Sequence, residues 1–185
     1  MRQWPHLSLL LSVFWFWLGD RLYRNPEHQS WGDLLLGFSW SWLAGSLYWG
    51  WLRWEPLLHL PVEAIGLPIA LWGLRSGWGR IGHWFYLGSL LGTGITDGYF
   101  YLINVIPHWR RIMVASPADV PSILHEALLN LRTPWGTGWA LGLALVLIAL
   151  ARLPQSQDDL HRWTFSGTIV GTLLVDALFG LAACL

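Results

Sequence analysis

The sequence predicts an all-α, polytopic transmembrane helix bundle of about six spans, and three observations carry this prediction. The chain has 185 residues, of which 54% are hydrophobic and only 12% charged, whereas soluble domains carry roughly twice that charged fraction. It contains 16 Trp, a residue that concentrates at membrane–water interfaces because its ring has a dry face and a wet edge. Long apolar segments recur from one end of the chain to the other. We therefore expect a single integral membrane domain over residues 1–185.

Six segments approach the length that a helix needs to cross a bilayer, roughly 20 residues for about 30 Å. In order, they are Trp4–Gly19, Leu34–Leu52, Leu57–Leu74, Ile81–Ile106, Gly136–Leu153 and Trp163–Leu185. No small-residue cleavage motif follows the first segment, which favours a span over a cleaved signal peptide. Arginine residues divide almost equally between the two ends of these spans, so the positive-inside rule predicts no orientation.

The one long connection, residues 107–135, predicts a short amphipathic helix between spans four and five. Asp119 or Ser122 can cap its amino terminus, and Thr133-Pro134 ends it. Its apolar residues fall on one face: Ile123, Leu124, Ala127, Leu128 and Leu131. We expect this helix to lie in the membrane interface, or alternatively to pack as a cap over the bundle.

An internal similarity links the fourth and sixth expected spans. Residues 84–100 and 163–179 align at a constant offset and share Trp84/Trp163, Gly88/Gly167, Gly92/Gly171, Thr93/Thr172, Asp97/Asp176 and Phe100/Phe179. The same offset carries the third span onto the fifth. Residues 57–106 and 136–185 therefore indicate a parallel repeat of two hairpins, with chance similarity among common Gly and Trp as the alternative.

Each copy of this similarity carries a polar stripe beside a glycine pair. The stripes, at i, i+4 and i+8 on one helix face, are Ser89, Thr93 and Asp97, and Thr168, Thr172 and Asp176. The glycine pairs are Gly88/Gly92 and Gly167/Gly171, in the G-x-x-x-G spacing that lets a second helix approach closely. We expect each stripe to face a tightly packed neighbour. The four glycines are also candidates for contact with a membrane-protein partner or a second copy of the chain.

Three acidic residues, Glu63, Asp97 and Asp176, lie near the middle of their expected spans. Within these bounds the one Arg is Arg152, at the end of the fifth span, so we expect the three acids to lack a basic partner at their own depth. A carboxylate in hydrocarbon must be protonated, bind a cation or face a wet cavity, which makes these residues candidates for ion or ligand binding. The alternative is structural: a protonated Asp can hydrogen-bond a Ser or Thr across a helix contact.

His59 precedes Glu63 by one helical turn and shares its face. Pro61 and Pro68 interrupt the same span, so they free backbone carbonyls that need other partners. A pair at this spacing can provide two ligands of a divalent metal, but a hydrogen-bonded pair lining a polar pocket is the preferred interpretation. We expect no metal site.

Several familiar signatures are missing from the chain. It has no phosphate-binding glycine loop, no zinc-type cysteine set and no nucleophile elbow, so we expect a non-enzymatic protein without catalytic residues. No motif indicates a cofactor, so the sequence makes no prediction about one. The formal net charge is zero, which gives no basis for nucleic-acid binding.

Three strings resemble a known family. They are GFSWSWLAGSLYWGWLRWEPLLHLPVEAIGLPIALWGL at residues 37–74, GHWFYLGSLLGTGITDGYFYLINVIPHWR at 82–110 and LRTPWG at 131–136. They resemble a family of multi-pass membrane proteins from cyanobacteria, domain of unknown function 3120, from about residue 31 to the end. The resemblance implies a cyanobacterial plasma or thylakoid membrane and a link to photosynthesis. It transfers no catalytic residue.

Two functions follow as expectations. The first is a transport or solute/cation-binding membrane subunit, with a polar centre built from Asp97, Asp176, Glu63, His59 and the two hydroxyl stripes. The second is an accessory or assembly factor for a photosynthetic membrane complex, docked through the glycine pairs. Acids that face each other inside the bundle favour the first function, and acids that point outward favour the second.

Overall fold

The computed structural model describes residues 4–152 and 159–183, and within these residues the chain is helical, without a strand. The all-α prediction is confirmed. The helices are α1 (Pro5–Tyr23), α2 (Gln29–Leu47), α3 (His59–Glu63), α4 (Leu67–Ser76), α5 (Arg80–Leu102), α6 (Ile106–Val114), α7 (Val120–Leu131), α8 (Pro134–Ala151) and α9 (Leu160–Ala183). Shorter turns complete them: a π-helix η1 (Tyr48–Leu52) and the 3₁₀ turns η2 (Pro56–Leu58) and η3 (Ala64–Gly66).

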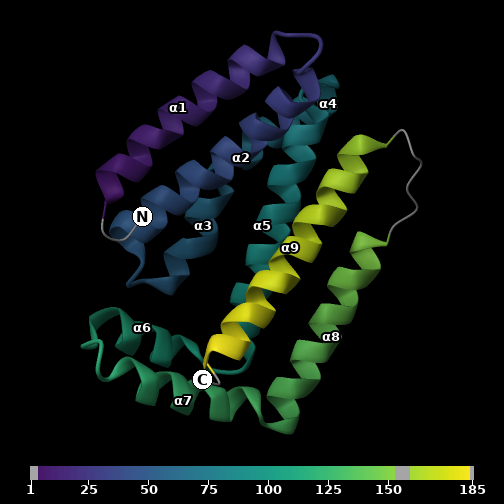
Figure 1. The fold of residues 1–185 in the computed structure, drawn as a ribbon. Coiled ribbons are helices and arrows are strands. Elements are labelled where there is room, and N and C mark those ends of the chain that lie inside the picture. Colours follow the sequence, from purple (N-terminus) through teal and green to yellow (C-terminus); the bar gives the residue numbers. More distant parts are fainter. Residues whose placement is uncertain (1–3, 153–158, 184–185) are drawn as a thin grey trace.

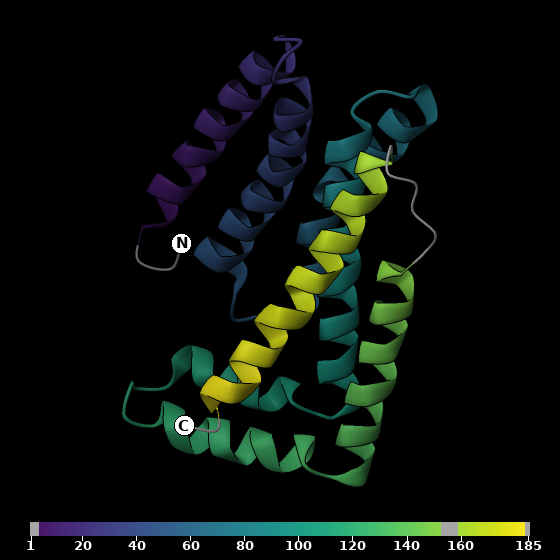
Figure 2. The ribbon, with the colours of Figure 1, turned by 45° about the vertical axis from the view of Figure 1, so that its right-hand side comes forward.

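The long helices lie side by side, and two short ones cross one end of the bundle (Figures 1 and 2). The α1–α2 hairpin packs beside α5, which contacts α9 along much of its length, while α8 lies outside that pair. Helices α5 and α9 run in the same direction (Figure 1). This is the orientation that a parallel repeat requires, although the repeat itself stays a prediction.

Small residues let the amino-terminal helices pack closely. A Cβ atom on Gly32 would lie 2.1 Å from the backbone nitrogen of Tyr23, and one on Gly37 would lie 2.1 Å from the carbonyl oxygen of Gly82. Buried Asp33 of α2 accepts hydrogen bonds from the first amides of α5, at 2.9 Å from Ile81 N and 3.0 Å from Gly82 N. Asp33 therefore caps α5 from another helix, which fixes where α5 begins against α2.

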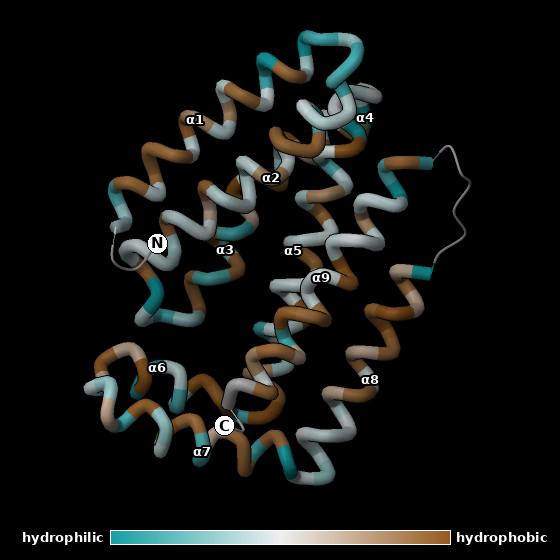
Figure 3. Tube along the Cα trace, in the orientation of Figure 1, coloured by the Kyte–Doolittle hydropathy of each residue, from teal (hydrophilic) through white to brown (hydrophobic). Residues whose placement is uncertain are grey.

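Each expected apolar segment is mostly helical over its described residues, although the fourth stops being helical at Leu102, before its expected end at Ile106. Three helical stretches meet the length and composition needed to cross a membrane. These three are Pro56–Ser76, Pro134–Ala151 and Leu160–Leu181. Figure 3 shows α8 as hydrophobic along most of its length. The segments corresponding to α1, α2 and α5 are not among these three. The expected ends at Leu153 and Leu185, together with Cys184, lie outside the described residues.

The long connection forms two helices where the sequence predicted one. Helix α7 falls in the predicted segment, and Ile123, Ala127 and Leu128 are buried on one of its faces, while a place in the membrane interface stays a prediction. Asp119 precedes it, but its carboxylate accepts a hydrogen bond from Ser116 Oγ at 2.8 Å and does not cap the helix amides.

Helix α6 was not expected. It follows a sharp turn at Asn104, whose φ of 58° closes the end of α5 with a bond from Val105 N to Phe100 O at 2.9 Å. The turn sends α6 across the end of the bundle (Figure 2).

Candidate functional site

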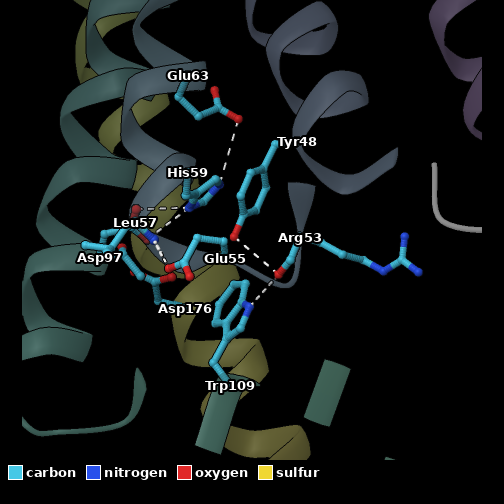
Figure 4. Close-up of polar contacts among 10 residues, drawn as sticks. Tyr48, Arg53, Glu55, Leu57, His59, Glu63, Asp97, Trp109 and Asp176 are labelled. Carbon is cyan, nitrogen blue, oxygen red and sulfur yellow. Dashed lines mark hydrogen bonds and ion pairs between the residues drawn. The ribbon is translucent and has the colours of Figure 1, made fainter. Parts of the chain in front are cut away.

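A cluster of ionisable side chains joins α3 to α5 inside the bundle. His59 Nδ1 lies 3.0 Å from both carboxylate oxygens of Asp97, and His59 Nε2 lies 3.9 Å from Glu63 Oε1 (Figure 4). The first separation is a hydrogen bond and the second only an ion-pair distance. All three side chains are at most 14% exposed. The structure thus brings together three residues predicted for the site, and His59 stands between the two acids.

The position of His59 and Glu63 depends on a broken helix. Pro56, Pro61 and Pro68 interrupt the segment, and η3 separates α3 from α4. The buried phenol of Tyr86 bridges this break: its hydroxyl donates to Glu63 O at 2.5 Å and accepts from Gly66 N at 3.0 Å. Two backbone groups at the break therefore find their partner on α5, which ties α3 to the helix that carries Asp97.

Asp176 reaches the same region from α9 and has a different partner. Thr96 Oγ1 donates a hydrogen bond to Asp176 Oδ2 at 2.7 Å. Asp97 lies close enough to act on Asp176 electrostatically, as Figure 4 illustrates. A hydroxyl–carboxyl bond across a helix contact is the structural alternative considered for the buried acids, and Asp176 fits it better than Asp97 does.

Aromatic rings enclose the imidazole of His59. Tyr48 stacks on it, with ring centroids 4.2 Å apart, while Trp49 and Trp109 lie 6.2 and 6.3 Å away. Tyr48 and Trp49 belong to η1, and π-helical turns of this kind frequently mark functional sites. The imidazole is therefore packed against aromatic rings on one side and faces the two carboxyls on the other.

Helix α6 covers the side of the cluster that faces the end of the bundle. Trp109 Nε1 donates to Arg53 O at 2.9 Å, and Arg110 Nη2 lies 2.9 Å from Glu55 Oε1. The hydrogen bond from Arg110, together with one from Leu57 N, lowers the pKa of the Glu55 carboxyl below its ordinary value. Trp109 thus lies beside the imidazole of His59, and α6 covers this end of the centre.

The two predicted stripes pack differently from each other. The Cβ positions of Gly88 and Gly92 would come within 3.1 Å of Thr168 Cβ and 2.3 Å of Thr172 Oγ1, so these glycines accommodate the α9 stripe. Gly167 and Gly171 have nothing within 4 Å. The α9 stripe therefore faces a tightly packed neighbour, as expected, whereas the glycine pair of α9 mediates no close approach among the described residues.

The hydroxyls of the stripes serve their own helix more than the site. Thr168 Oγ1 donates to Thr164 O at 2.7 Å and Thr172 Oγ1 to Thr168 O at 3.2 Å. On α5, Ser89 and Thr93 are half-buried. The hydroxyl that does reach a carboxyl belongs to Thr96, which lies outside the predicted stripe.

One expectation about the acids is wrong. Asp97 has a basic partner at its own depth, since His59 lies 3.0 Å away. The sequence paired His59 with Glu63 by helical spacing, but contact with α5 depends on how the broken helix packs. Sequence reasoning also missed Tyr48, Tyr86 and Trp109. The prolines indicated that a partner was needed, yet nothing in the sequence selects which side chain provides it.

The comparisons with known proteins identify a family. The model of the family described as "Protein of unknown function (DUF3120)" matches residues 1–184. The chain belongs to this family. The match includes the first 30 residues, so the expectation that the resemblance begins near residue 31 is wrong, and α1 is a full helix of 19 residues. Comparisons with curated proteins and with solved structures found no match.

Metal ligation was also tested against the geometry. In residues 4–152 and 159–183, no three His, Cys, Asp or Glu side chains are grouped so as to hold a metal ion. His59, Asp97 and Glu63 are instead oriented toward one another, with the imidazole between the carboxyls (Figure 4).

Proposed function

We propose that this DUF3120 protein is a non-enzymatic integral membrane subunit that binds and transports a cation at the His59 centre. The observation that carries the proposal is the placement of His59 between Asp97 and Glu63, inside the bundle and with Asp176 nearby. Three acids against one imidazole leave an excess of negative charge when the acids are ionised. Because buried charge must be compensated, this centre favours a positively charged ligand.

The proposal places all six apolar segments across the membrane. Besides the three that meet the length and composition criteria, we assign α1, α2 with η1, and α5 as spans. The outward side chains of α1 support this assignment, since Leu10 and Val13 are 67% and 68% exposed. Apolar surface of this kind is unfavourable in contact with water and favourable in contact with lipid. Helices α6 and α7 then lie at one membrane surface, where their ion pairs meet water.

A broken helix beside a buried charge supports a transport role. Discontinuous spans at the bilayer midplane form the substrate sites of several transporter folds, because unwound backbone is tolerated only where protein or a cavity surrounds it. Here the break at η3 directly follows Glu63, and Tyr86 satisfies it. The mobile unit that we propose is α3, whose displacement would carry His59 and Glu63 relative to Asp97.

The test is a measurement of charge movement in reconstituted protein. Proteoliposomes adsorbed on a solid-supported membrane receive steps of pH, Na⁺, K⁺, Ca²⁺ or ammonium, and the transient current is recorded. We expect a response to at least one of these cations, and its loss in Asp97→Asn. Asp20→Asn, a change at an exposed residue of α1 paired with Arg24, is the matched control. Wild-type protein that responds to none of the cations would overturn the proposal.

A second candidate function is the docking of a membrane partner, including assembly of a photosynthetic complex. The observation in its favour is that Gly138 and Gly142 of α8, like Gly167 and Gly171 of α9, have open space where a Cβ would be. The space beside Gly88 and Gly92 is filled by α9, so these two glycines are not part of the proposed docking surface. Purification of tagged protein from native membranes tests it: a Gly167→Leu/Gly171→Leu variant should lose a co-purifying subunit that wild-type protein retains.

A further inference from the structure

We infer that the cation handled by this centre is the proton, and that the imidazole of His59 relays it between the carboxyls of Asp97 and Glu63. The inference rests on the proposed function and specifies its ligand. It follows from where the imidazole lies, since a ring that occupies the space between two carboxyls takes the position that a bound cation would need. The ligand must therefore be one that His59 can itself carry.

The geometry gives each imidazole nitrogen its own carboxyl. Nδ1 lies 3.0 Å from both Oδ1 and Oδ2 of Asp97, whereas Nε2 faces Glu63 Oε1 at 3.9 Å. A neutral imidazole has one donor and one acceptor nitrogen, and the imidazolium has two donors. His59 can thus accept a proton at one nitrogen while it gives one up at the other.

The step moves one proton and no electrons. The O–H bond of protonated Asp97 breaks as an N–H bond forms at Nδ1, and the N–H bond at Nε2 breaks as an O–H bond forms on Glu63. Asp97 gains the negative charge that Glu63 loses, and His59 changes tautomer. The same exchange in reverse restores the first tautomer and resets the ring.

One gap must close during this step. The separation of 3.9 Å at Nε2 exceeds hydrogen-bond reach, so the ring must shift toward Glu63 or a water molecule must bridge the two atoms. Tyr48 provides a flat surface for such a shift, since its ring lies 4.2 Å from the imidazole at an interplanar angle of 29°. Pro61, between His59 and Glu63, limits the backbone hydrogen bonds that would otherwise keep α3 rigid.

Other charged and titratable groups surround the relay on every side. Glu63 faces His59 from α3, Asp97 from α5 and Tyr48 from η1. Asp176 of α9 and Glu55, which is paired with Arg110 of α6, also lie near the cluster. Arg110 is bound to Glu55, and Trp109 lies between α6 and the imidazole. The carboxyls of Asp97 and Glu63 are therefore the direct partners of the ring.

The experiment uses proteoliposomes in a medium whose other cation is N-methyl-D-glucamine. We expect a pH step alone to move charge in wild-type protein, and steps of Na⁺, K⁺, Ca²⁺ or ammonium at constant pH to move none. His59→Gln and Glu63→Gln should each reduce the displaced charge at least tenfold. His125→Gln, at an exposed position of α7, should leave it unchanged. A response to a metal ion or ammonium without one to pH would overturn the proton inference and leave the cation proposal standing. No response to any step would overturn both.

A spectroscopic measurement keeps the inference testable if a variant folds poorly. The chain has seven His, so ¹⁵N-histidine spectra of protein in nanodiscs, compared with His59→Gln, identify the signal of His59. We expect the ¹⁵N chemical shifts of Nδ1 and Nε2 to show which nitrogen carries the proton, and the balance between the two tautomers to differ between wild-type protein and Glu63→Gln, because the relay exchanges that proton with Glu63. Glu63→Gln should keep the fold, because Tyr86 bonds the backbone oxygen of Glu63. A tautomer balance that Glu63→Gln leaves unchanged would contradict the relay.

Discussion

The hydroxyl of Tyr86 lies 2.5 Å from the carbonyl oxygen of Glu63, and this pairing decides where the broken helix presents its charges. The same hydroxyl accepts from Gly66 N, so one side chain of α5 satisfies both ends of the 3₁₀ turn η3. An unpaired backbone group inside the bundle would have no water to bond, which makes the phenol a structural requirement. The His59–Glu63 pair is consequently held to α5 through backbone atoms as well as through Asp97.

Tyr86→Phe should destabilise the protein and loosen the centre. The substitution keeps the ring in its buried position but leaves Glu63 O and Gly66 N without a partner, at a cost of about 1–3 kcal/mol in the free energy of unfolding. The measurement is the unfolding equilibrium in detergent micelles. Tyr101→Phe, at a partly exposed residue of the same helix, is the control and should change little. Equal stability of the two variants would show that the break does not need the phenol.

The glycine pairs provide a second prediction with a built-in control. Gly92→Ala places a methyl group 2.3 Å from Thr172 Oγ1, so α5 and α9 must separate and the protein loses about 1–3 kcal/mol of stability. Gly171→Ala is the same change at the equivalent position of α9, where nothing lies within 4 Å. It should leave the fold intact. Thermal unfolding of both variants in one detergent compares them, and equal losses would contradict the packing described for α5 and α9.

The sequence was sufficient to predict which segments are helical, because the lengths of the apolar runs and the Pro and Gly residues at their ends are local signals. The inner face of α7 was predicted from spacing alone, and Ile123, Ala127 and Leu128 are buried as expected. Helix α6 was missed because Pro107 and two adjacent Arg residues obscure its short pattern. Its direction depends on the left-handed turn at Asn104, which no periodicity reveals.

The candidate site was predicted in part. Buried acids without Arg identified Glu63, Asp97 and Asp176, and helical spacing added His59. The contact between His59 and Asp97 joins residues 38 positions apart, so it depends on how α3 packs against α5 and not on any local spacing. The hydroxyl stripes were over-interpreted, since Thr168 and Thr172 bond their own helix backbone, whereas Thr96 makes the bond to Asp176.

The ion pair between Glu55 and Arg110 should make the attachment of α6 sensitive to acid. The pKa of Glu55 in the folded protein is lowered, chiefly by the hydrogen bond from Arg110. The stabilisation is therefore fully present above the ordinary pKa of 4.5 and is lost as the pH falls through the lowered pKa of the folded state. A spin label at Val114→Cys, in a Cys184→Ser background, reports the mobility of α6. We expect mobility to rise at that acidic transition.

Two variants separate this pair from the second ion pair of α6. In Glu55→Gln, the label should already be more mobile at neutral pH. Glu126 of α7 is the partner of Arg111, and the hydrogen bond from Arg111 lowers the pKa of the Glu126 carboxyl. Glu126→Gln removes this partner. If only Glu126→Gln changed the mobility, α6 would be attached through the pair between Arg111 and Glu126 of α7, and not through the pair between Arg110 and Glu55.

The two buried aspartates should respond differently to the same substitution. In Asp176→Asn, the amide oxygen can still accept the hydrogen bond from Thr96, so the free energy of unfolding should change by less than roughly 1 kcal/mol. In Asp97→Asn, the carboxylate that faces His59 Nδ1 is lost, so the charge moved by a pH step should fall at least tenfold. Asp176→Asn should retain most of that charge movement, because its carboxyl is bonded to Thr96 and not to the imidazole. Losses of equal size would mean that the two aspartates titrate as one unit, and Asp176 would then belong to the relay.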